Sequence, residues 1–185
     1  QAMVTFLNLV AAEPDIARVA VAAGSEQFPG AAVLTVSGAA RTGAGMVRCL
    51  APQQVLDLVL AERPEVVGHG IERADGGPHA IDLAAVGRTD ALVVGPGLAA
   101  DDPRARCGAD LLRSDRSAEE ADAHPGLDRG VIDAGALAAL TDAHRFGPDV
   151  VLTPHRGEAE RLIAELTHDT AALFDLAEIN RRDIR

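Results

Sequence analysis

The stretch from residue 150 to 158, with the sequence VVLTPHRGE, carries the polar side chains best suited to chemistry. Its apolar β-branched run predicts a short buried strand, and after the proline the apolar positions between 159 and 166 continue at helical spacing. The turn between them places Thr153 and His155 at the carboxyl end of the strand. Glu158 falls in the first helical turn, where a negative charge suits the helix dipole. Hydroxyl, imidazole and carboxylate groups are therefore gathered at one strand end.

Three earlier apolar runs end in turns of a similar kind. They pass into Gly24-Ser25, into Gly95-Pro96-Gly97 and into Asp133-Ala134-Gly135. In an open parallel α/β sheet, ligands bind outside the carboxyl ends of the strands, so we expect the four turns to line one site. Glycine loops and helix N-termini bind phosphate through backbone N–H groups, so such a site could accept a small nucleotide.

These turns require strands that alternate with helices. The apolar pattern predicts strands at 18–23, 46–50, 65–68, 90–94, 130–133 and 150–153, and helices at 31–40, 53–62, 103–112, 135–141 and after 155. A helical turn or two is expected at 80–86, a loop at 70–78, a solvated loop or frayed helix at 114–127, and a last helix at 170–182. The alternation predicts an α/β fold with a largely parallel sheet covered by helices on both faces. A length of 185 residues fits a single domain, residues 1–185.

Composition narrows the class of partner. The formal net charge is −11, and all 17 basic residues are arginines. Because nucleic-acid binding needs clustered basic side chains, we expect no nucleic-acid partner. No apolar stretch reaches about 18 residues, and no signal peptide is recognisable, so no membrane partner is expected either. The aromatic share of 2% predicts a core built from aliphatic side chains.

The cysteines and histidines show no pattern of metal or disulfide chemistry. Cys49 and Cys107 are far apart and form no CxxC motif, which fits a reducing cytoplasm and predicts no metal site. The remaining histidines share no ligand spacing and are interpreted as solvated surface positions: His69, His79, His124, His144 and His168.

Five ordered motifs together resemble a known family. They are FPGAAVL at 28–34, RTGAGMV at 41–47, VGPGL at 94–98, IDAGAL at 132–137 and LTPHRGE at 152–158. In this order they are similar to the ADP/ATP-dependent NAD(P)H-hydrate dehydratases of the ribokinase-like superfamily, over residues 17–166. Five motifs in sequence are far more specific than any lone glycine pair.

The resemblance implies a repair reaction. Hydrated NADH or NADPH (NADHX or NADPHX) would be dehydrated at the expense of ADP or ATP, with Mg²⁺, after phosphorylation of the ring hydroxyl. Ala32, Gly97 and His155 match the family's hydrate-binding positions. The resemblance gives supporting positions at Gly30, Ala31, Gly95, Pro96, Asp133, Thr153 and Glu158. A cytoplasmic homo-oligomer is expected.

Several departures from the family pattern bear on activity. The chain ends before the family's nucleotide-binding lysine-glycine segment and its GxGD motif, whose aspartate is the catalytic base. We therefore expect a fold that is incomplete at its C-terminus, no catalytic base within residues 1–185, and a chain that is inactive alone or completed by another polypeptide. The usual Asp-Ala-Asp-Ala-Leu turn has Gly135 in place of its second carboxylate, and Arg156 replaces a proline.

Other interpretations remain open at this point. The chain could be a ribokinase-like kinase of a thiazole or pyrimidine alcohol, or a non-catalytic nucleotide-binding homologue. His155 could hydrogen-bond only its own turn, and Gly95-Pro96-Gly97 could be only a strand-ending turn. Asp133 could be a helix N-cap instead of a site carboxylate.

Overall fold

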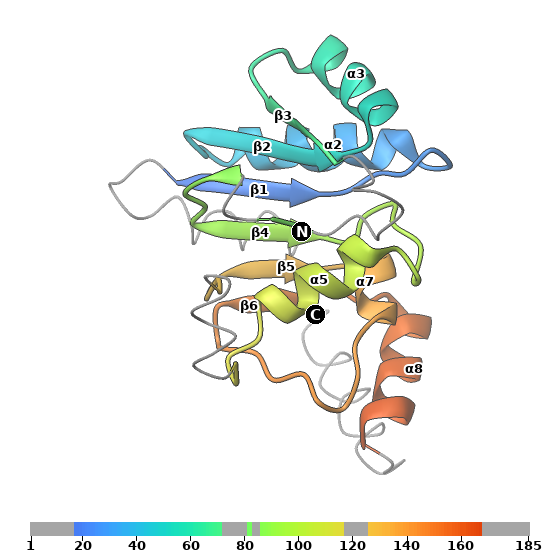
Figure 1. Cartoon of the computed structure of the whole chain (residues 1–185). Coiled ribbons are helices and arrows are strands. Elements are labelled where there is room, and N and C mark those ends of the chain that lie inside the picture. Colours follow the sequence, from blue (N-terminus) through green and yellow to red (C-terminus); the bar gives the residue numbers. More distant parts are fainter. Residues whose placement is uncertain (1–16, 72–80, 83–85, 117–125, 168–185) are drawn as a thin grey trace, which may run out of the picture.

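The computed structural model describes residues 17–71, 81–82, 86–116 and 126–167, and its six strands form one sheet in the order β3-β2-β1-β4-β5-β6 (Figure 1). Every neighbouring pair of strands is parallel, so all their carboxyl ends lie at one edge. The predicted α/β fold is therefore confirmed. The strands are β1 (Arg18–Ala22), β2 (Met46–Ala51), β3 (Val67–Gly70), β4 (Ala91–Val94), β5 (Gly130–Ile132) and β6 (Val150–Leu152). The helices are α2 (Pro29–Arg41), α3 (Gln53–Glu62), α5 (Pro103–Leu111), α7 (Ala134–Ala138) and α8 (Arg156–Thr167).

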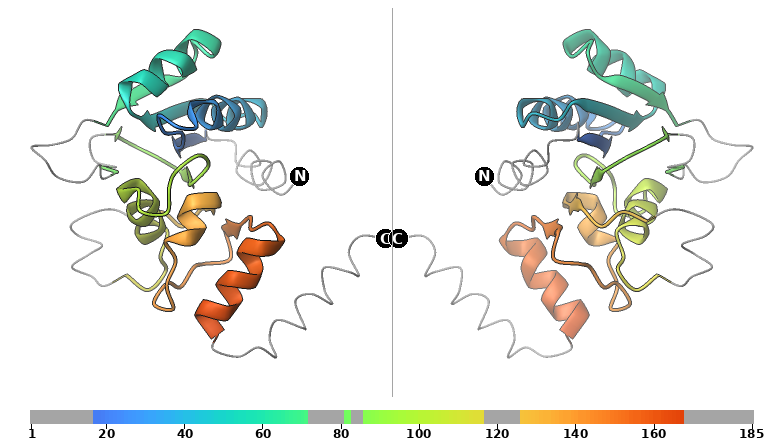
Figure 2. Two further views of the ribbon diagram at one scale, coloured as in Figure 1. Left: turned by 90° about the vertical axis from the view of Figure 1, so that its right-hand side faces the viewer. Right: turned by 90° about the vertical axis from the view of Figure 1, so that its left-hand side faces the viewer.

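Two aliphatic cores cover the two faces of the sheet. Successive side chains of a strand point to opposite faces. Val19 and Val21 of β1 belong to the core that includes residues of α2 and α3, whereas Ala20 and Ala22 belong to the core that includes α5 and α7. Helices therefore lie on both faces, as predicted, and Figure 2 shows this arrangement end-on.

Most predicted elements agree with the observed ones to within two residues. The helix at 53–62 has the predicted bounds. The helix predicted at 31–40 is α2 and ends at Arg41, with Gly43 at φ +89° directly after the C-cap residue Thr42. The predicted helix at 170–182 and most of the segments at 70–78, 80–86 and 114–127 lie outside the described residues. Among the helices that the structure describes, none has the length and apolar character needed to cross a bilayer.

The prediction that residues 150–153 form a buried strand is wrong with respect to burial. Val150 and Val151 are half-buried, and Leu152 is 38% exposed. A run of apolar residues is buried on both faces only where the strand has neighbours and covering helices on all sides. In the described sheet, β6 is the last strand and pairs with β5 alone.

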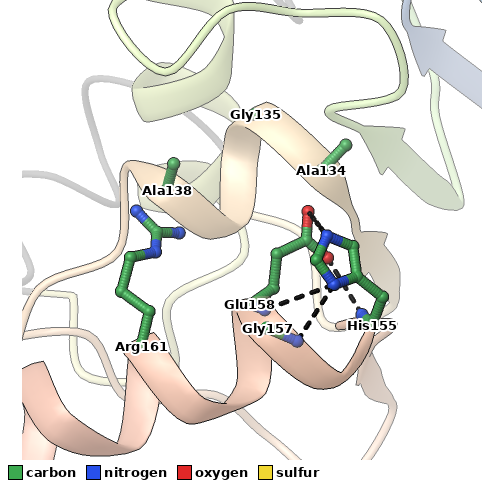
Figure 3. A pocket seen from close by; sticks show the side chains of 7 residues that line it. All are labelled: Ala134, Gly135, Ala138, His155, Gly157, Glu158 and Arg161. Carbon is green, nitrogen blue, oxygen red and sulfur yellow. Dashed lines mark hydrogen bonds and ion pairs between the residues drawn. The ribbon is translucent and has the colours of Figure 1, made fainter.

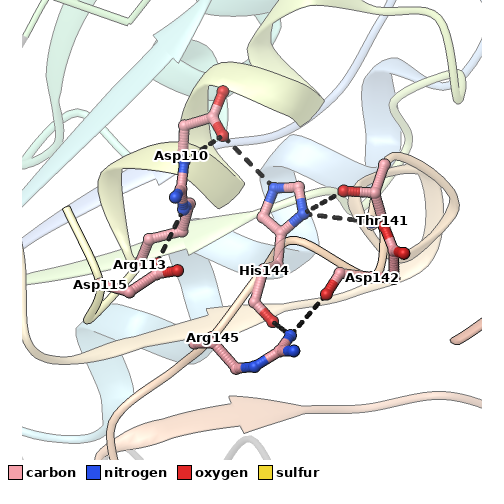
Figure 4. Close-up of polar contacts among 7 residues, drawn as sticks. All are labelled: Asp110, Arg113, Asp115, Thr141, Asp142, His144 and Arg145. Atoms are coloured by element: carbon pink, nitrogen blue, oxygen red, sulfur yellow. Dashed lines mark hydrogen bonds and ion pairs between the residues drawn. The ribbon is translucent and has the colours of Figure 1, made fainter. Parts of the chain in front are cut away.

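His144 is also not the solvated residue that we predicted. Its side chain is 6% exposed and lies between Asp110 and Thr141 (Figure 4). Its ring also stacks on Phe146, with the ring centroids 5.9 Å apart. Nδ1 accepts a hydrogen bond of 3.1 Å from the backbone N–H of Thr141, and Nε2 lies 3.3 Å from a carboxylate oxygen of Asp110. The ring therefore joins the loop before β6 to the last turns of α5. His69 is half-buried in β3, and His79, His124 and His168 lie outside the described residues.

Candidate functional site

The first part of the candidate site is the switch point between β1 and β4, where the order of the strands along the sheet reverses. The region outside the carboxyl ends of these two strands, beside Gly24 and Gly97, is called the crevice below. The order β3-β2-β1-β4-β5-β6 makes β1 and β4 neighbours, and ligands of open α/β sheets bind at such a switch point, outside the carboxyl ends of the strands. Two backbone hydrogen bonds join the turns that follow these strands. Gly24 N–H donates to the carbonyl of Pro96 at 2.8 Å, and Gly95 N–H donates to the carbonyl of Ala22 at 3.1 Å.

Gly97 lets the turn after β4 lie directly against the start of α2. Its φ is +71°, and a Cβ at this position would lie 2.6 Å from Cβ of Ala31 and 3.0 Å from the carbonyl oxygen of Phe28. A side chain would therefore push the two segments apart. Ala32 is fully buried beneath the turn after β1, where its Cβ would lie 2.7 Å from a Cβ added to Gly24. The predicted contacts of Ala32 and Gly97 with a hydrate stay predictions.

The turn after β5 carries the departure at Gly135. Asp133 N–H donates to the carbonyl of Val94 at 3.0 Å, which sets this turn beside the one after β4. A Cβ on Gly135 would lie 2.1 Å from the carbonyl oxygen of Leu98, so this backbone leaves no room for the carboxylate that the resemblance leads one to expect. Asp133 occupies the N-cap position of α7, but its half-buried side chain makes no capping hydrogen bond.

The turn after β6 forms a reciprocal cap at the start of α8. Thr153 N–H donates to the carbonyl of Ile132 at 3.1 Å, which places the turn beside β5. Nδ1 of His155 accepts hydrogen bonds from the N–H groups of Gly157 at 3.1 Å and Glu158 at 3.4 Å. In return, the carboxylate of Glu158 accepts from the N–H of His155 at 2.9 Å. This is the pattern of a capping box, with an imidazole in place of the usual hydroxyl.

A cavity of about 400 Å³ opens between α7 and α8, next to this cap (Figure 3). His155, whose side chain is 74% exposed, and Glu158 line it, as does Arg161, whose guanidinium extends towards α7 near Ala138. Arg161 is not among the site residues predicted from the sequence. The available signal was its position one helical turn after Glu158, on the same face of the helix. The full lining is Ala134, Gly135, Ala138, His155, Gly157, Glu158 and Arg161.

The four predicted turns thus share one edge, but they do not line one cavity. Gly24 and Gly97 lie at the crevice between β1 and β4, whereas His155 and Glu158 line the cavity between α7 and α8. The turn after β5 lies between the two parts: its Asp133 N–H donates to the carbonyl of Val94 in β4, and the N–H of Thr153 in the turn after β6 donates to the carbonyl of Ile132 in β5. The candidate site is therefore a row of four turns along the edge of the sheet where the strands end.

The described residues do not form a metal cage. No group of three or more His, Cys, Asp or Glu side chains comes together in the part of the chain that the structure describes. Mg²⁺ usually keeps several waters and binds through one or two carboxylates together with substrate phosphates. These residues do not provide a dedicated Mg²⁺ site, and we derive no chemical step through the ion.

Comparison with known proteins places this arrangement in a family. The model of the Carb_kinase family, described as NAD(P)H-hydrate dehydratase, matches residues 19–182. A bifunctional NAD(P)H-hydrate repair enzyme, Nnr, of Corynebacterium glutamicum is 36% identical over 156 residues, which are 80% of this chain and 23% of that protein.

Two solved structures show the same fold. The ADP/ATP-dependent NAD(P)H-hydrate dehydratase of Bacillus subtilis, co-crystallised with ATP/Mg²⁺ and soaked with CoA, is 28% identical. It matches with a TM-score of 0.58 over 92% of this chain and 58% of that one. A ribokinase-like superfamily protein of Enterococcus faecalis matches with a TM-score of 0.59 at 20% identity, over 89% of this chain and 58% of that one. The chain thus spans less than two thirds of each of these proteins, and it belongs to the NAD(P)H-hydrate dehydratase (Carb_kinase) family, with a ribokinase-like fold.

Proposed function

We propose that this chain acts in the ADP- or ATP-dependent dehydration of NADHX and NADPHX back to NADH and NADPH. The observation that carries the proposal is the family match over residues 19–182. The relatives support the same reaction, since a Bacillus subtilis protein that is 33% identical over 140 residues is an ADP-dependent (S)-NAD(P)H-hydrate dehydratase. A related crystal structure was obtained with ATP/Mg²⁺.

The geometry suits an extended, phosphorylated ligand. Such a substrate carries a hydrated nicotinamide ring at one end, an adenine ring at the other, and anionic phosphates between them. The chain has a net charge of −11, so an anion needs local positive charge or backbone N–H groups to bind. Arg161 supplies a cation at the cavity between α7 and α8, and its guanidinium fork matches phosphate geometry. We infer that Arg161 contacts a phosphate of the hydrate.

His155 is placed to orient the substrate. Because Nδ1 accepts from two backbone N–H groups, the neutral ring carries its proton on Nε2, and that atom lies 3.4 Å from the carboxylate of Glu158. The Nε2–H group can therefore donate a hydrogen bond to a carbonyl or hydroxyl oxygen of the hydrated ring. Hydrogen-bond donation of this kind positions a substrate; we assign no catalytic base to the described residues.

The test is turnover by the purified chain. It is incubated with NADPHX, MgCl₂ and either ADP or ATP, and the absorbance of the reduced nicotinamide is followed. We expect thermal stabilisation of the protein by NADPHX; recovery of NADPH that depends on the nucleotide would show in addition that the purified chain has a catalytic base. If the chain binds but lacks part of the catalytic machinery, stabilisation occurs without turnover.

A control reaction separates the kinase alternative. The same protein is incubated with ATP and a thiazole or pyrimidine alcohol, and formation of the phosphorylated alcohol is measured. Phosphoryl transfer to such an alcohol, with neither turnover nor stabilisation by NADPHX, would overturn the proposed function.

A further inference from the structure

A buried arginine holds the crevice from beneath. Arg104 lies in the first turn of α5, and only 3% of its side chain is exposed. Its Nε and Nη2 donate to the two carboxylate oxygens of Asp102 at 3.0 Å and 2.7 Å. Asp102 is also the N-cap of α5, since its side chain accepts from the backbone N–H of Arg104 at 2.9 Å. The pair is thus fixed to the helix that carries it.

The remaining donors of the guanidinium reach the ends of two strands. Nη2 donates to the carbonyl of Gly24 at 2.9 Å, and Nη1 donates to the carbonyl of Leu50 at 3.3 Å. The pairing of β1 with β2 stops at Val21 and Cys49, although β2 continues to Ala51. Carbonyl groups beyond that point have no partner in β1, and a buried carbonyl without a hydrogen bond is costly. Arg104 supplies the missing donors.

We propose that Arg104 is a positioning residue for the substrate crevice. It fixes the carbonyl of Gly24, and the N–H of the same residue donates to Pro96 in the turn after β4. That turn includes Gly97, which packs against Ala31 and beside Gly24. The guanidinium therefore holds the turn after β1 from its buried side, and that turn is bonded to the turn after β4. The functional part of this inference rests on the proposed function, whereas the structural part does not.

The chemistry of this site requires arginine. A guanidinium presents five donors in a rigid fork, and Arg104 uses three of its nitrogens at once, towards a carboxylate and two carbonyls. A lysine keeps the charge but cannot make the bidentate contact with Asp102 while bonding both carbonyls. Arg104→Lys therefore keeps the positive charge but removes the hydrogen-bond geometry of the guanidinium, so it tests the geometry alone. The lysine side chain also fills the space that a small residue would leave as a cavity.

Amide hydrogen exchange measured by NMR tests the structural part. The variants are Arg104→Lys and Arg104→Met, and the matched control is Arg106→Met, because Arg106 is exposed on the same helix. We expect the amide of Gly24 to exchange at least tenfold faster in both Arg104 variants, measured relative to the amide of Val93 in the centre of the sheet. The control should leave the ratio unchanged. Equal acceleration at Gly24 and Val93 in Arg104→Lys would overturn the inference, since it indicates only a loss of global stability.

Kinetics with NADPHX test the functional part. If the wild type turns over, we expect Arg104→Lys to raise KM at least fivefold with a smaller change in kcat. If the wild type binds NADPHX without turnover, the Kd for NADPHX takes the place of KM, and we expect the same rise. A KM equal to that of the wild type, despite faster exchange at Gly24, would overturn the assignment to the substrate crevice. If the wild type neither turns over nor binds NADPHX, the proposed function fails, and the exchange result alone decides whether Arg104 positions the turn. If Arg104→Met does not fold, the same measurements are made on Arg104→Lys and Asp102→Asn.

Discussion

Replacing His155 with alanine should separate two roles that one imidazole can have. In the structure Nδ1 accepts from the N–H groups of Gly157 and Glu158, so His155→Ala leaves two donors at the start of α8 without this partner. Loss of an N-cap acceptor costs about 1 kcal/mol, with a range of about 0.5–2. Because 74% of the side chain is exposed, little buried apolar area is lost in addition. We therefore expect the free energy of unfolding to fall by about 1 kcal/mol, and Tm by about 2–4 °C.

The matched variant is His155→Ser. A serine hydroxyl at the N-cap accepts from the same backbone N–H groups, and serine is among the preferred N-cap residues. We expect His155→Ser to recover most of the lost stability. It cannot replace the donor at Nε2, however. If the imidazole also contacts the hydrate, KM for NADPHX should rise by up to roughly tenfold in both variants, because one hydrogen bond contributes about 0.5–1.5 kcal/mol.

Two measurements decide between the roles: urea unfolding at pH 7, and steady-state kinetics or thermal stabilisation with NADPHX. An alanine variant as stable as the wild type would show that the cap contributes nothing. A serine variant that recovers both stability and the KM of the wild type would show that His155 only caps the helix. Stability recovered without recovery of KM is the result that we expect.

Three further predictions concern stability and reactivity. Gly97→Ala should lower the free energy of unfolding, measured in urea, by about 1–3 kcal/mol, because Gly97 has a φ of +71° and an added Cβ would contact Ala31. The control is Gly30→Ala, which should not lower it, since no atom lies within 4 Å of the added Cβ. Burial tends to raise the pKa of Asp90, but the backbone N–H of Arg18 and the Arg88 side chain outweigh it and lower that pKa. Asp90→Asn should therefore cost about 1–2 kcal/mol at pH 6. The difference from the wild type should shrink as the pH is lowered through the ordinary carboxyl range to the lower pKa of Asp90, which urea unfolding at pH 6 and at acidic pH would measure. Burial raises the pKa of the Cys49 thiol to about 12, although the charge of Arg104 acts in the opposite direction. Cys49 of the native protein should therefore not react with a thiol reagent at pH 8. Rapid labelling of Cys49 without urea would contradict this prediction.

The elements that could be predicted are those whose pattern is local. The helix at 53–62 buries Val55 and Val59, which lie one helical turn apart, and this spacing is visible in the sequence; Leu58, which continues the same apolar pattern, is 41% exposed. Turn residues likewise mark where each strand ends, and parallel pairing then brings those ends to one edge. The positions of the four turns therefore followed from the sequence, although their division between a crevice and a cavity did not.

The elements that could not be predicted depend on neighbours that are distant in sequence. An arginine in a helix is usually exposed, and nothing local shows that Arg104 meets carbonyl groups 54 and 80 residues away. His144 is buried because the end of α5 and Phe146 lie beside it, whereas the surrounding sequence is polar. The exposure of Leu152 likewise follows from the place of β6 in the sheet order, which an apolar run does not encode.

The candidate site depends more on backbone positions than on reactive side chains. Each turn is fixed by an N–H bond to the adjacent strand or turn: Gly24 to Pro96, Asp133 to Val94, and Thr153 to Ile132. A shift of one strand is therefore passed to the next turn in the row. Because these bonds run in sequence from β1 to β6, substitutions that loosen packing beneath a turn should weaken binding as strongly as substitutions of His155 or Arg161. Variants such as Gly97→Ala and Arg104→Lys are consequently more informative about this site than a scan limited to its charged surface.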